Sequence, residues 1–260
     1  MLIFTICYCA LCVPLSASAW GTRAHRIVAH IATAYLSIQT QQEVVDLIKT
    51  QSLADIAFDA DLWRQTRPET SPWHYVNIPF AVSDYDPRRD CPNGDCIIDV
   101  IAKYRGIVGD HNFSKEVRRE ALTFIVHLVA DAHQPLHCID NSDRGGNDVA
   151  VTFFATPTNL HAVWDNELLF RTQLGERAYT HRLITWLASQ NIEGLQHGTL
   201  VDWVLEAHDL ARKHAYLLPD DRNLRSGYYS ANLPVVDSQL AKAGVRLARL
   251  LNDTLHAATQ

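Results

Sequence analysis

The sequence of 260 residues has little positive charge: 23 Lys and Arg stand against 29 Asp and Glu, which gives a formal net charge of -6. Proteins that bind nucleic acid through a broad basic surface need many Lys and Arg side chains, because these displace counterions from the phosphates. The composition argues against that mode of binding. Any ligand that carries phosphate would have to find its positive charge elsewhere.

The chain also lacks other features that would direct the interpretation. Beyond residue 20, no stretch approaches the roughly 18 apolar residues of a membrane-spanning helix. Internal repeats, a low-complexity linker and a glycine-rich phosphate loop are absent as well. Since 47% of the residues are apolar and 20% are charged, the composition is that of a globular protein with one large domain or two small ones.

The first 19 residues contain no charged side chain. They hold an apolar run and end in Ala-Ser-Ala directly before Trp20, which is typical of a secretory signal peptide and its cleavage site. We therefore predict a signal peptide at residues 1–19, a mature domain at residues 20–260, and a protein that is secreted or periplasmic. A membrane anchor is the alternative, which the shortness of the apolar run disfavours. No stable membrane association is expected.

After residue 20 only three cysteines remain. Cys91 and Cys96 enclose the turn-forming sequence Pro-Asn-Gly-Asp, so in an exported protein we expect them to close a small disulfide loop. Cys138 is then left without a partner. A zinc site that uses these thiols is an alternative, but the chain offers no second cysteine pair to complete one.

Apolar residues recur at helical spacing through most of the chain. Residues 68–95, which hold five of the ten prolines, are expected to be rich in loops, and residues 149–154 give the one convincing strand. The pattern favours a single, predominantly α-helical domain. We expect helices at residues 24–36, around 44–48, 117–136 with a stop at Pro135, 160–170, 178–188, 200–217 and 238–255.

Histidine, in contrast, is abundant, with 13 copies. His127 and Asp131 lie four residues apart within a predicted helix and therefore on one face, and His161 and Asp165 repeat this spacing. Imidazole nitrogen and carboxylate oxygen bind Zn²⁺ at about 2.0 to 2.2 Å. The chain offers more donors than one tetrahedral ion needs, which indicates several metal ions. The further donors are His25, Asp61, His74 and His137.

Each pair taken alone has a plainer explanation, because His and Asp at this spacing more often form a hydrogen-bonded or solvated helix face than a ligand pair. His127 differs, since it lies between Val126 and Leu128 on an apolar helix, where an unpaired imidazole is costly to bury. We interpret the histidines without such a setting as structural or surface residues. They are His30, His111, His133, His181, His197, His208, His214 and His256.

Taken in order, the motifs around these donors resemble those of the zinc-dependent single-strand nucleases of the S1/P1 family. The resemblance runs from Trp20 to the C-terminal helix, and as an ordered set the motifs are highly specific. They are Trp20-Gly21, Ala24-His25, Ala60-Asp61, Trp73-His74, Val126-His127, Gln134-Pro135-Leu136-His137, Gly145-Gly146-Asn147, Asn159-Leu160-His161 and Trp164-Asp165.

The resemblance implies a single compact, mainly α-helical domain of the zinc-dependent phospholipase C and S1/P1 nuclease type, with a small β-hairpin. It also implies three zinc ions per chain, in a cleft. The implied ligands are Asp61, His74 and His127 for one zinc; His25 and the α-amino and carbonyl groups of Trp20 for a second, with Asp131 as a bridge between these two; and His137, His161 and Asp165 for the third.

The activity that the resemblance implies is hydrolysis of P–O3′ bonds in single-stranded DNA and RNA to 5′-phosphorylated products, with 3′-nucleotidase activity, no protein partner and a monomeric chain. Asp61 would also orient or deprotonate the attacking water. Tyr75 would stack on an unpaired base, and Asn147 would contact phosphate. Asn77 lies where fungal relatives carry an acid in the base pocket, so the base preference of this chain need not be theirs.

Two alternatives stay open. A zinc-dependent phospholipase C resembles this family in its fold and in its N-terminal Trp ligand, but its last ligand is typically Glu, where this chain has Asp165. A secreted zinc-binding protein without catalysis would require the loss of an essential donor, and none is missing from the sequence.

Overall fold

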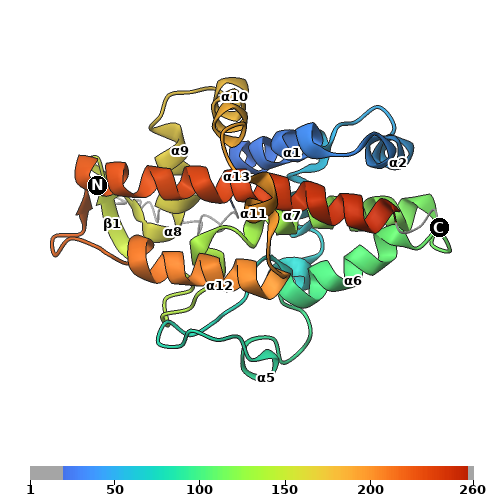
Figure 1. The fold of residues 1–260 in the computed structure, drawn as a ribbon. Coiled ribbons are helices and arrows are strands. Elements are labelled where there is room, and N and C mark those ends of the chain that lie inside the picture. Colours follow the sequence, from blue (N-terminus) through green and yellow to red (C-terminus); the bar gives the residue numbers. More distant parts are fainter. Residues whose placement is uncertain (1–19, 257–260) are drawn as a thin grey trace, which may run out of the picture.

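The longest helix, α13 (Ser226–His256), forms the axis of the molecule (Figure 1). The computed structural model describes residues 20–256, so the predicted signal peptide at residues 1–19 lies outside the described residues. α1 (Thr22–Tyr35) packs along α13. Its buried residues, among them Ile27 and Ile31, recur at helical spacing and therefore form one apolar face of the helix. The pair α1 and α13 thus builds part of the core.

The second long helix, α7 (Lys115–Asp131), lies in the core, and every residue from Ala121 to Asp131 is buried. A helix buried on all sides is expected to be apolar all round. This helix instead carries His127 and Asp131 on a buried face, so the core holds polar groups that must find partners.

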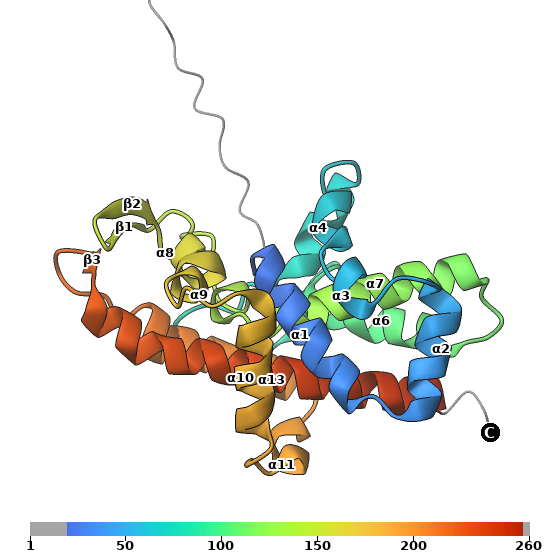
Figure 2. The same ribbon diagram turned by 90° about the horizontal axis from the view of Figure 1, so that it is seen from above.

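Shorter elements surround these three helices. Figure 2 shows that α4, α8 and the β1–β2 hairpin lie on one side of α13 and α11 on the other. Among the described residues, no helix combines the length and the apolarity needed to cross a membrane. The other helices are α2 (Ile38–Ile48), α3 (Leu53–Ile56), α4 (Asp59–Trp63), α5 (Pro87–Asp90), α6 (Ile97–Gly109), α8 (Leu160–Ala162), α9 (Leu168–Phe170), α10 (Glu176–Leu187), α11 (Ile192–Gln196) and α12 (Leu200–Leu210), the 3₁₀ helices η1 (Pro68–His74) and η2 (Pro135–His137), and the π-helices η3 (Val163–Glu167) and η4 (Ala211–Ala215).

A small sheet has the strand order β2-β1-β3. β1 (Ala150–Phe153) pairs antiparallel with β2 (Thr156–Asn159) and parallel with β3 (Asn223–Leu224). The predicted strand corresponds to β1, and the implied hairpin is β1–β2. Its turn is made by Phe154 and Ala155, both with positive φ, rather than by the Asn-Gly or Asp-Gly pair that signals such a turn. The turn residues therefore did not indicate β2, which was expected only from the family resemblance.

The structure confirms a single, mainly α-helical domain but corrects the expected start of the last helix. α13 begins at Ser226 instead of residue 238 and continues through Pro234. A proline inside a helix removes a backbone hydrogen bond and costs about 3 kcal/mol. Burial of the following residues, among them Val236 and Leu240, offsets that cost. α6 was not among the expected helices.

Gly244 allows α1 and α13 to approach closely. A Cβ atom on Gly244 would lie 2.4 Å from Cγ2 of Ile31 and 3.2 Å from the carbonyl oxygen of Val28. These atoms belong to α1, whose first turns carry His25. The close helix contact therefore fixes the position of a predicted metal ligand.

We predict that Gly244→Ala lowers the free energy of unfolding by about 1–3 kcal/mol, because the methyl group overpacks the contact with Ile31. Gly106→Ala in α6 is the matched control: apart from its chain neighbours and the backbone of its own helix, no described atom lies within 4 Å of its Cβ position. That substitution should raise stability by about 0.5–1 kcal/mol through helix propensity. Chemical denaturation measures both, and a stabilising Gly244→Ala would show that the two helices do not meet there.

Candidate metal centre

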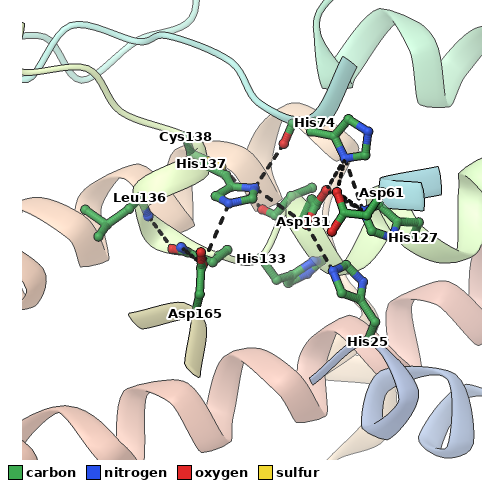
Figure 3. Close-up of polar contacts among 12 residues, drawn as sticks. His25, Asp61, His74, His127, Asp131, His133, Leu136, His137, Cys138 and Asp165 are labelled. Atoms are coloured by element: carbon green, nitrogen blue, oxygen red, sulfur yellow. Dashed lines mark hydrogen bonds and ion pairs between the residues drawn. The ribbon is translucent and has the colours of Figure 1, made fainter. Parts of the chain in front are cut away.

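Asp131, at the end of α7, is the centre of a buried cluster of histidines (Figure 3). Its Oδ2 lies 3.0 Å from Nδ1 of His74 and 3.1 Å from Nε2 of His127. Its Oδ1 lies 3.4 Å from Nε2 of His25 and 3.5 Å from Nδ1 of His137. A single carboxylate with no solvent exposure therefore faces four imidazole rings from α1, η1, α7 and η2.

The predicted ligands fall into three groups, and the donor atoms within each group lie within 4.8 Å of one another. In the first group, Oδ1 of Asp61 lies 3.7 Å from both Nδ1 of His74 and Nε2 of His127. His127 also belongs to the second group, so these two adjoin. The groups are Asp61, His74 and His127; His25, His127 and Asp131; and His137, His161 and Asp165.

Hydrogen bonds to backbone carbonyl oxygens fix the tautomer of three rings. Nδ1 lies 2.8 Å from the Ala57 oxygen in His127 and 2.7 Å from the Gly145 oxygen in His161. In His137 it lies 3.0 Å from the oxygen of His74. Because a carbonyl oxygen only accepts, each Nδ1 donates, and Nε2 of each ring becomes the atom that can bind a metal.

Several buried polar atoms of the centre have no hydrogen-bond partner within the described part of the chain. They are both ring nitrogens of His25, Nε2 of His74 and Oδ1 of Asp131. Leaving such atoms buried without a partner costs free energy, and the cost is largest near a charge. A bound cation would satisfy them, so the donor set fits a metal, and its mixture of imidazole and carboxylate is the kind that zinc accepts.

Burial keeps several of these rings in the neutral form that binds metal. It lowers the pKa of His25 and of His137, and it lowers the pKa of His74 to about 4. Three of the four rings around Asp131 are thus neutral at physiological pH even before any metal binds.

His127 is protonated, and its positive charge compensates the neighbouring carboxylates. Burial acts to lower its pKa, but the charges of Asp131 and Asp61 outweigh burial and raise the pKa to about 9. Burial likewise acts to raise the pKa of Asp131, and the neighbouring His127 and His137 hold it well below its usual range. The proton at Nε2 of His127 therefore lies where a metal would bind, and metal binding should release it.

The third group is organised around Asp165, which lies in the π-helix η3. Single π-helical turns often occur at functional sites. Nε2 of His161 lies 3.2 Å from Asp165 Oδ2, and the rings of His137 and His161 stack with centroids 5.1 Å apart. Gln134, fully buried, donates from Nε2 to Asp165 Oδ1 at 2.6 Å and accepts from the backbone N–H of Leu136. The sequence did not identify Gln134 as a positioning group.

Trp20 is completely buried at the start of the described residues. Its indole Nε1 has no hydrogen-bond partner within residues 20–256. The next residue, Gly21, donates its N–H to the carbonyl oxygen of Asp165 at 3.0 Å. Trp20 therefore lies beside the third group, and its role as a ligand stays a prediction.

A pocket of about 240 Å³ opens beside the centre. Tyr75 and Asn77 are exposed while Val76 and Ile78 between and after them are buried, as expected for an extended strand-like segment. The pocket is lined by the histidines at 74, 137 and 161, by the expected substrate-binding residues Tyr75, Asn77 and Asn147, and by Arg64, Leu136, Asp140, Arg144 and Gly145.

Arg64 and Arg144 also line this pocket, although neither was predicted from the sequence as a site residue. Arg64 donates from a guanidinium nitrogen to Oδ1 of Asp61 at 2.9 Å. The sequence feature that could have identified Arg64 is its position three residues after Asp61, at the end of α4, because residues at this spacing are neighbours on a helix surface. Arg144 precedes the Gly-Gly-Asn turn, where nothing in the spacing distinguishes it from a surface residue.

The cysteines lie outside this centre. Cys91 and Cys96 form a disulfide, and Cys138 is the free cysteine among the described residues. Burial raises the pKa of the Cys138 thiol, which keeps it protonated. A zinc site built on these thiols is therefore not supported, since disulfide sulfurs cannot act as thiolate ligands.

Four of the histidines interpreted as structural, His30, His111, His133 and His208, have hydrogen-bond partners outside the three donor groups. His30 pairs with Glu176 at 2.8 Å. In the buried His133, Nδ1 donates to the Val129 carbonyl oxygen, while Nε2 accepts from Arg246 at 3.0 Å. These rings are accounted for by the fold.

Comparison with known proteins places the chain in a family. The family model described as S1/P1 Nuclease matches residues 20–256, and the chain belongs to that family. Membership supports a nuclease, with nucleic acid as its class of substrate.

Individual relatives cover most of the chain. Nuclease P1 of Penicillium citrinum is 30% identical over 90% of this chain and 97% of its own length. Nuclease S1 of Aspergillus oryzae is 29% identical over 90% of this chain and 91% of its own length. Endonuclease 4 of Arabidopsis thaliana is 30% identical over 90% of this chain and 88% of its own length.

We predict that the Asp131→Asn substitution removes the negative charge that four histidine rings of the cluster face. The variant should bind zinc at least about 100-fold more weakly, and without metal its free energy of unfolding should fall by about 3–5 kcal/mol, because His127 loses a buried partner. Metal analysis and denaturation measure the two effects. Asp209→Asn, which removes an exposed partner of Lys213, is the control. Wild-type metal content in Asp131→Asn would contradict a centre built on this carboxylate.

Proposed function

We propose that the chain is a secreted, zinc-dependent endonuclease that hydrolyses P–O3′ bonds of single-stranded DNA and RNA to 5′-phosphorylated products, and that it also acts on 3′-nucleotides. The observation that carries the proposal is the set of three neighbouring buried donor groups, with unpartnered metal-binding atoms, beside a pocket that their members His74, His137 and His161 line. Membership of the S1/P1 nuclease family supports it.

The proposed ligands are the side chains of the three groups, with Trp20 beside them. When bound, zinc supplies the positive charge that a phosphate requires and lowers the pKa of water toward neutrality. By this proposal the residues that hold the ions are Asp61, His74 and His127 for the first; Trp20, His25 and the shared Asp131 for the second; and His137, His161 and Asp165 for the third.

Asp61 is the proposed group that orients the attacking water and accepts its proton. It is 8% exposed and lies at the edge of the cluster, whereas Asp131 is completely buried. Arg64 holds one of its oxygens at 2.9 Å and lines the pocket, so a cation lies next to the place where substrate phosphate would enter. Arginine suits that place because its planar guanidinium can bind a phosphate through two donors.

Tyr75, next to the ligand His74, is the proposed platform for a base. Its side chain is 39% exposed, and its ring lines the pocket together with Asn77 and Asn147. A base can lie flat on such a ring only after it leaves the duplex stack, which would make the enzyme selective for single strands. The backbone of Tyr75 is held by the N–H of Ile97, directly after the disulfide.

Two other features of the proposal rest on the sequence. Export through a cleavable signal peptide is supported by the Ala-Ser-Ala sequence and by the Cys91–Cys96 disulfide. A monomer without protein partners is the simplest form that completes the centre, since all three donor groups come from one chain.

We predict that protein beginning at Trp20 cleaves single-stranded DNA and RNA when zinc is present and stops after treatment with a chelator. Asp61→Asn should lower kcat by at least about 100-fold, because the water loses its base. Asp59→Asn, on the same helix but outside the three groups, is the matched control. Gel analysis of labelled oligonucleotides measures both variants.

The same assay separates the alternatives. Release of phosphocholine from phosphatidylcholine vesicles, with oligonucleotides left intact, would identify a phospholipase C. Full zinc loading without cleavage of either substrate would identify a zinc-binding protein.

A further prediction concerns the N-terminus of the mature chain. If the α-amino group of Trp20 binds zinc, protein that keeps one additional residue before Trp20 should lose about one zinc ion and most of its activity, since an amide nitrogen is a poor ligand. Metal analysis of the two forms measures this. Equal activity and zinc content in the extended form would show that the amine is not a ligand.

A further inference from the structure

Arg144 lines the pocket but belongs to none of the three donor groups. Its side chain is 76% exposed, yet the residue lines the same pocket as His137 and His161. In a chain with a net charge of -6, an exposed cation at this pocket calls for a reason.

The loop that carries Arg144 is fixed to the metal centre. The neighbouring carbonyl oxygen of Gly145 accepts the Nδ1–H of His161 at 2.7 Å. On the other side, the buried Asp143 accepts the Tyr216 hydroxyl at 2.8 Å and the Gly146 N–H at 2.9 Å. The backbone at Arg144 is therefore held in place relative to a proposed zinc ligand, without help from its own side chain.

The backbone of this loop is strained. Ser142 and Arg144, which are not glycine, have positive φ values of 57° and 55°, and Gly145 follows with 59°. Glycine or asparagine would adopt this conformation at lower cost than arginine. Strained residues of this kind collect at functional sites, where binding offsets the strain.

In this structure the guanidinium group of Arg144 is paired with Asp148. Nε lies 3.2 and 3.1 Å from the two carboxylate oxygens, and a terminal nitrogen lies 2.9 Å from Oδ1. Both side chains are exposed, and exposed ion pairs contribute little to stability. A ligand with the same paired-oxygen geometry, such as a phosphate, can therefore replace Asp148 at low cost.

We propose that Arg144 binds a phosphate of the polynucleotide other than the one being cleaved, and that Asp148 is the exchangeable partner that holds the guanidinium ready and weakens binding until exchange occurs. The proposal rests on the proposed nuclease function. Arg64 is 23% exposed and bonds to Asp61 of the first donor group, whereas Arg144 is 76% exposed and bonds to Asp148 outside the three groups, so we assign the two arginines to different phosphates. Arg144 thereby favours chains over mononucleotides.

The test compares substrates with one phosphate and with many. For Arg144→Ala, kcat/KM on a single-stranded 10-mer should fall about tenfold, the loss of one charge-assisted contact, while kcat/KM on a 3′-mononucleotide stays within about twofold of wild type. The slope of log(kcat/KM) for the 10-mer against log salt should become less steep by about 0.7, the contribution of one single-strand phosphate contact.

Two further variants sharpen the result. Asp148→Asn removes the competing carboxylate and should lower KM for the 10-mer, the opposite direction from Arg144→Ala. Arg225→Ala, which removes an exposed arginine that faces Asp221 outside this pocket, is the charge-matched control and should behave as wild type. If Asp148 only ordered the loop, Asp148→Asn would weaken both substrates, and that outcome overturns the exchange.

Equal losses of Arg144→Ala on mononucleotide and 10-mer, or an unchanged salt slope, would likewise overturn the proposal. Binding of a fluorescent phosphorothioate 10-mer is measured on the same proteins by anisotropy. If the wild type cleaves no nucleic acid, the proposed function fails, and the binding comparison still decides the role of Arg144: equal affinity of wild type and Arg144→Ala refutes it.

Discussion

The structure depends on one buried charge, the carboxylate of Asp131. It has no solvent exposure, and rings from four separate elements face it at 3.0 to 3.5 Å: His25, His74, His127 and His137. An isolated carboxylate in such a place would cost many kcal/mol, so its partners must assemble with it. Folding of α1, η1, α7 and η2 around Asp131 and construction of the candidate metal centre are therefore one process.

Part of this centre could be predicted from the sequence, because the periodicity of a helix is a local property. A donor and its partner four residues apart share a helix face whatever surrounds them, so His127 with Asp131 and His161 with Asp165 were visible. The long-range contacts were not visible. The hydrogen bond from His127 to the carbonyl oxygen of Ala57 joins residues 70 positions apart, and no local pattern predicts it.

The fold, like the centre, could be predicted only where local sequence patterns determine the structure. Most of the longer helices were predicted from recurring apolar residues, but α6 was missed, α13 runs through Pro234 ahead of its expected start at residue 238, and the Phe154–Ala155 turn did not indicate β2. Burial along α13 outweighs a missing hydrogen bond, and the pairing of β1 with β3 supports a hairpin whose turn residues are unfavourable. Tertiary packing decides such positions, and a single sequence does not display it.

The net negative charge of the chain restricts where a polyanion could bind. The charge of -6 still excludes a broad basic groove. Three zinc ions, as proposed, would add about six positive charges at one place and formally balance it. Arg64 and Arg144 add cations at the same pocket, each held beside a carboxylate. Attraction for a polyanion would then be confined to the site of hydrolysis.

The first described residues, Trp20 and Gly21, are also connected to the candidate metal centre. A Cβ atom on Gly21 would lie 1.7 Å from Oδ1 of Asn166, so a larger residue between Trp20 and the π-helix that carries Asp165 would require the Asn166 side chain to move. The Gly21 N–H in turn bonds to the Asp165 carbonyl oxygen at 3.0 Å. Because these contacts join the first described residues to a donor group, displacement of Trp20 and Gly21 would disturb the backbone of Asp165. The position of the N-terminal segment and the geometry of the third donor group are therefore coupled.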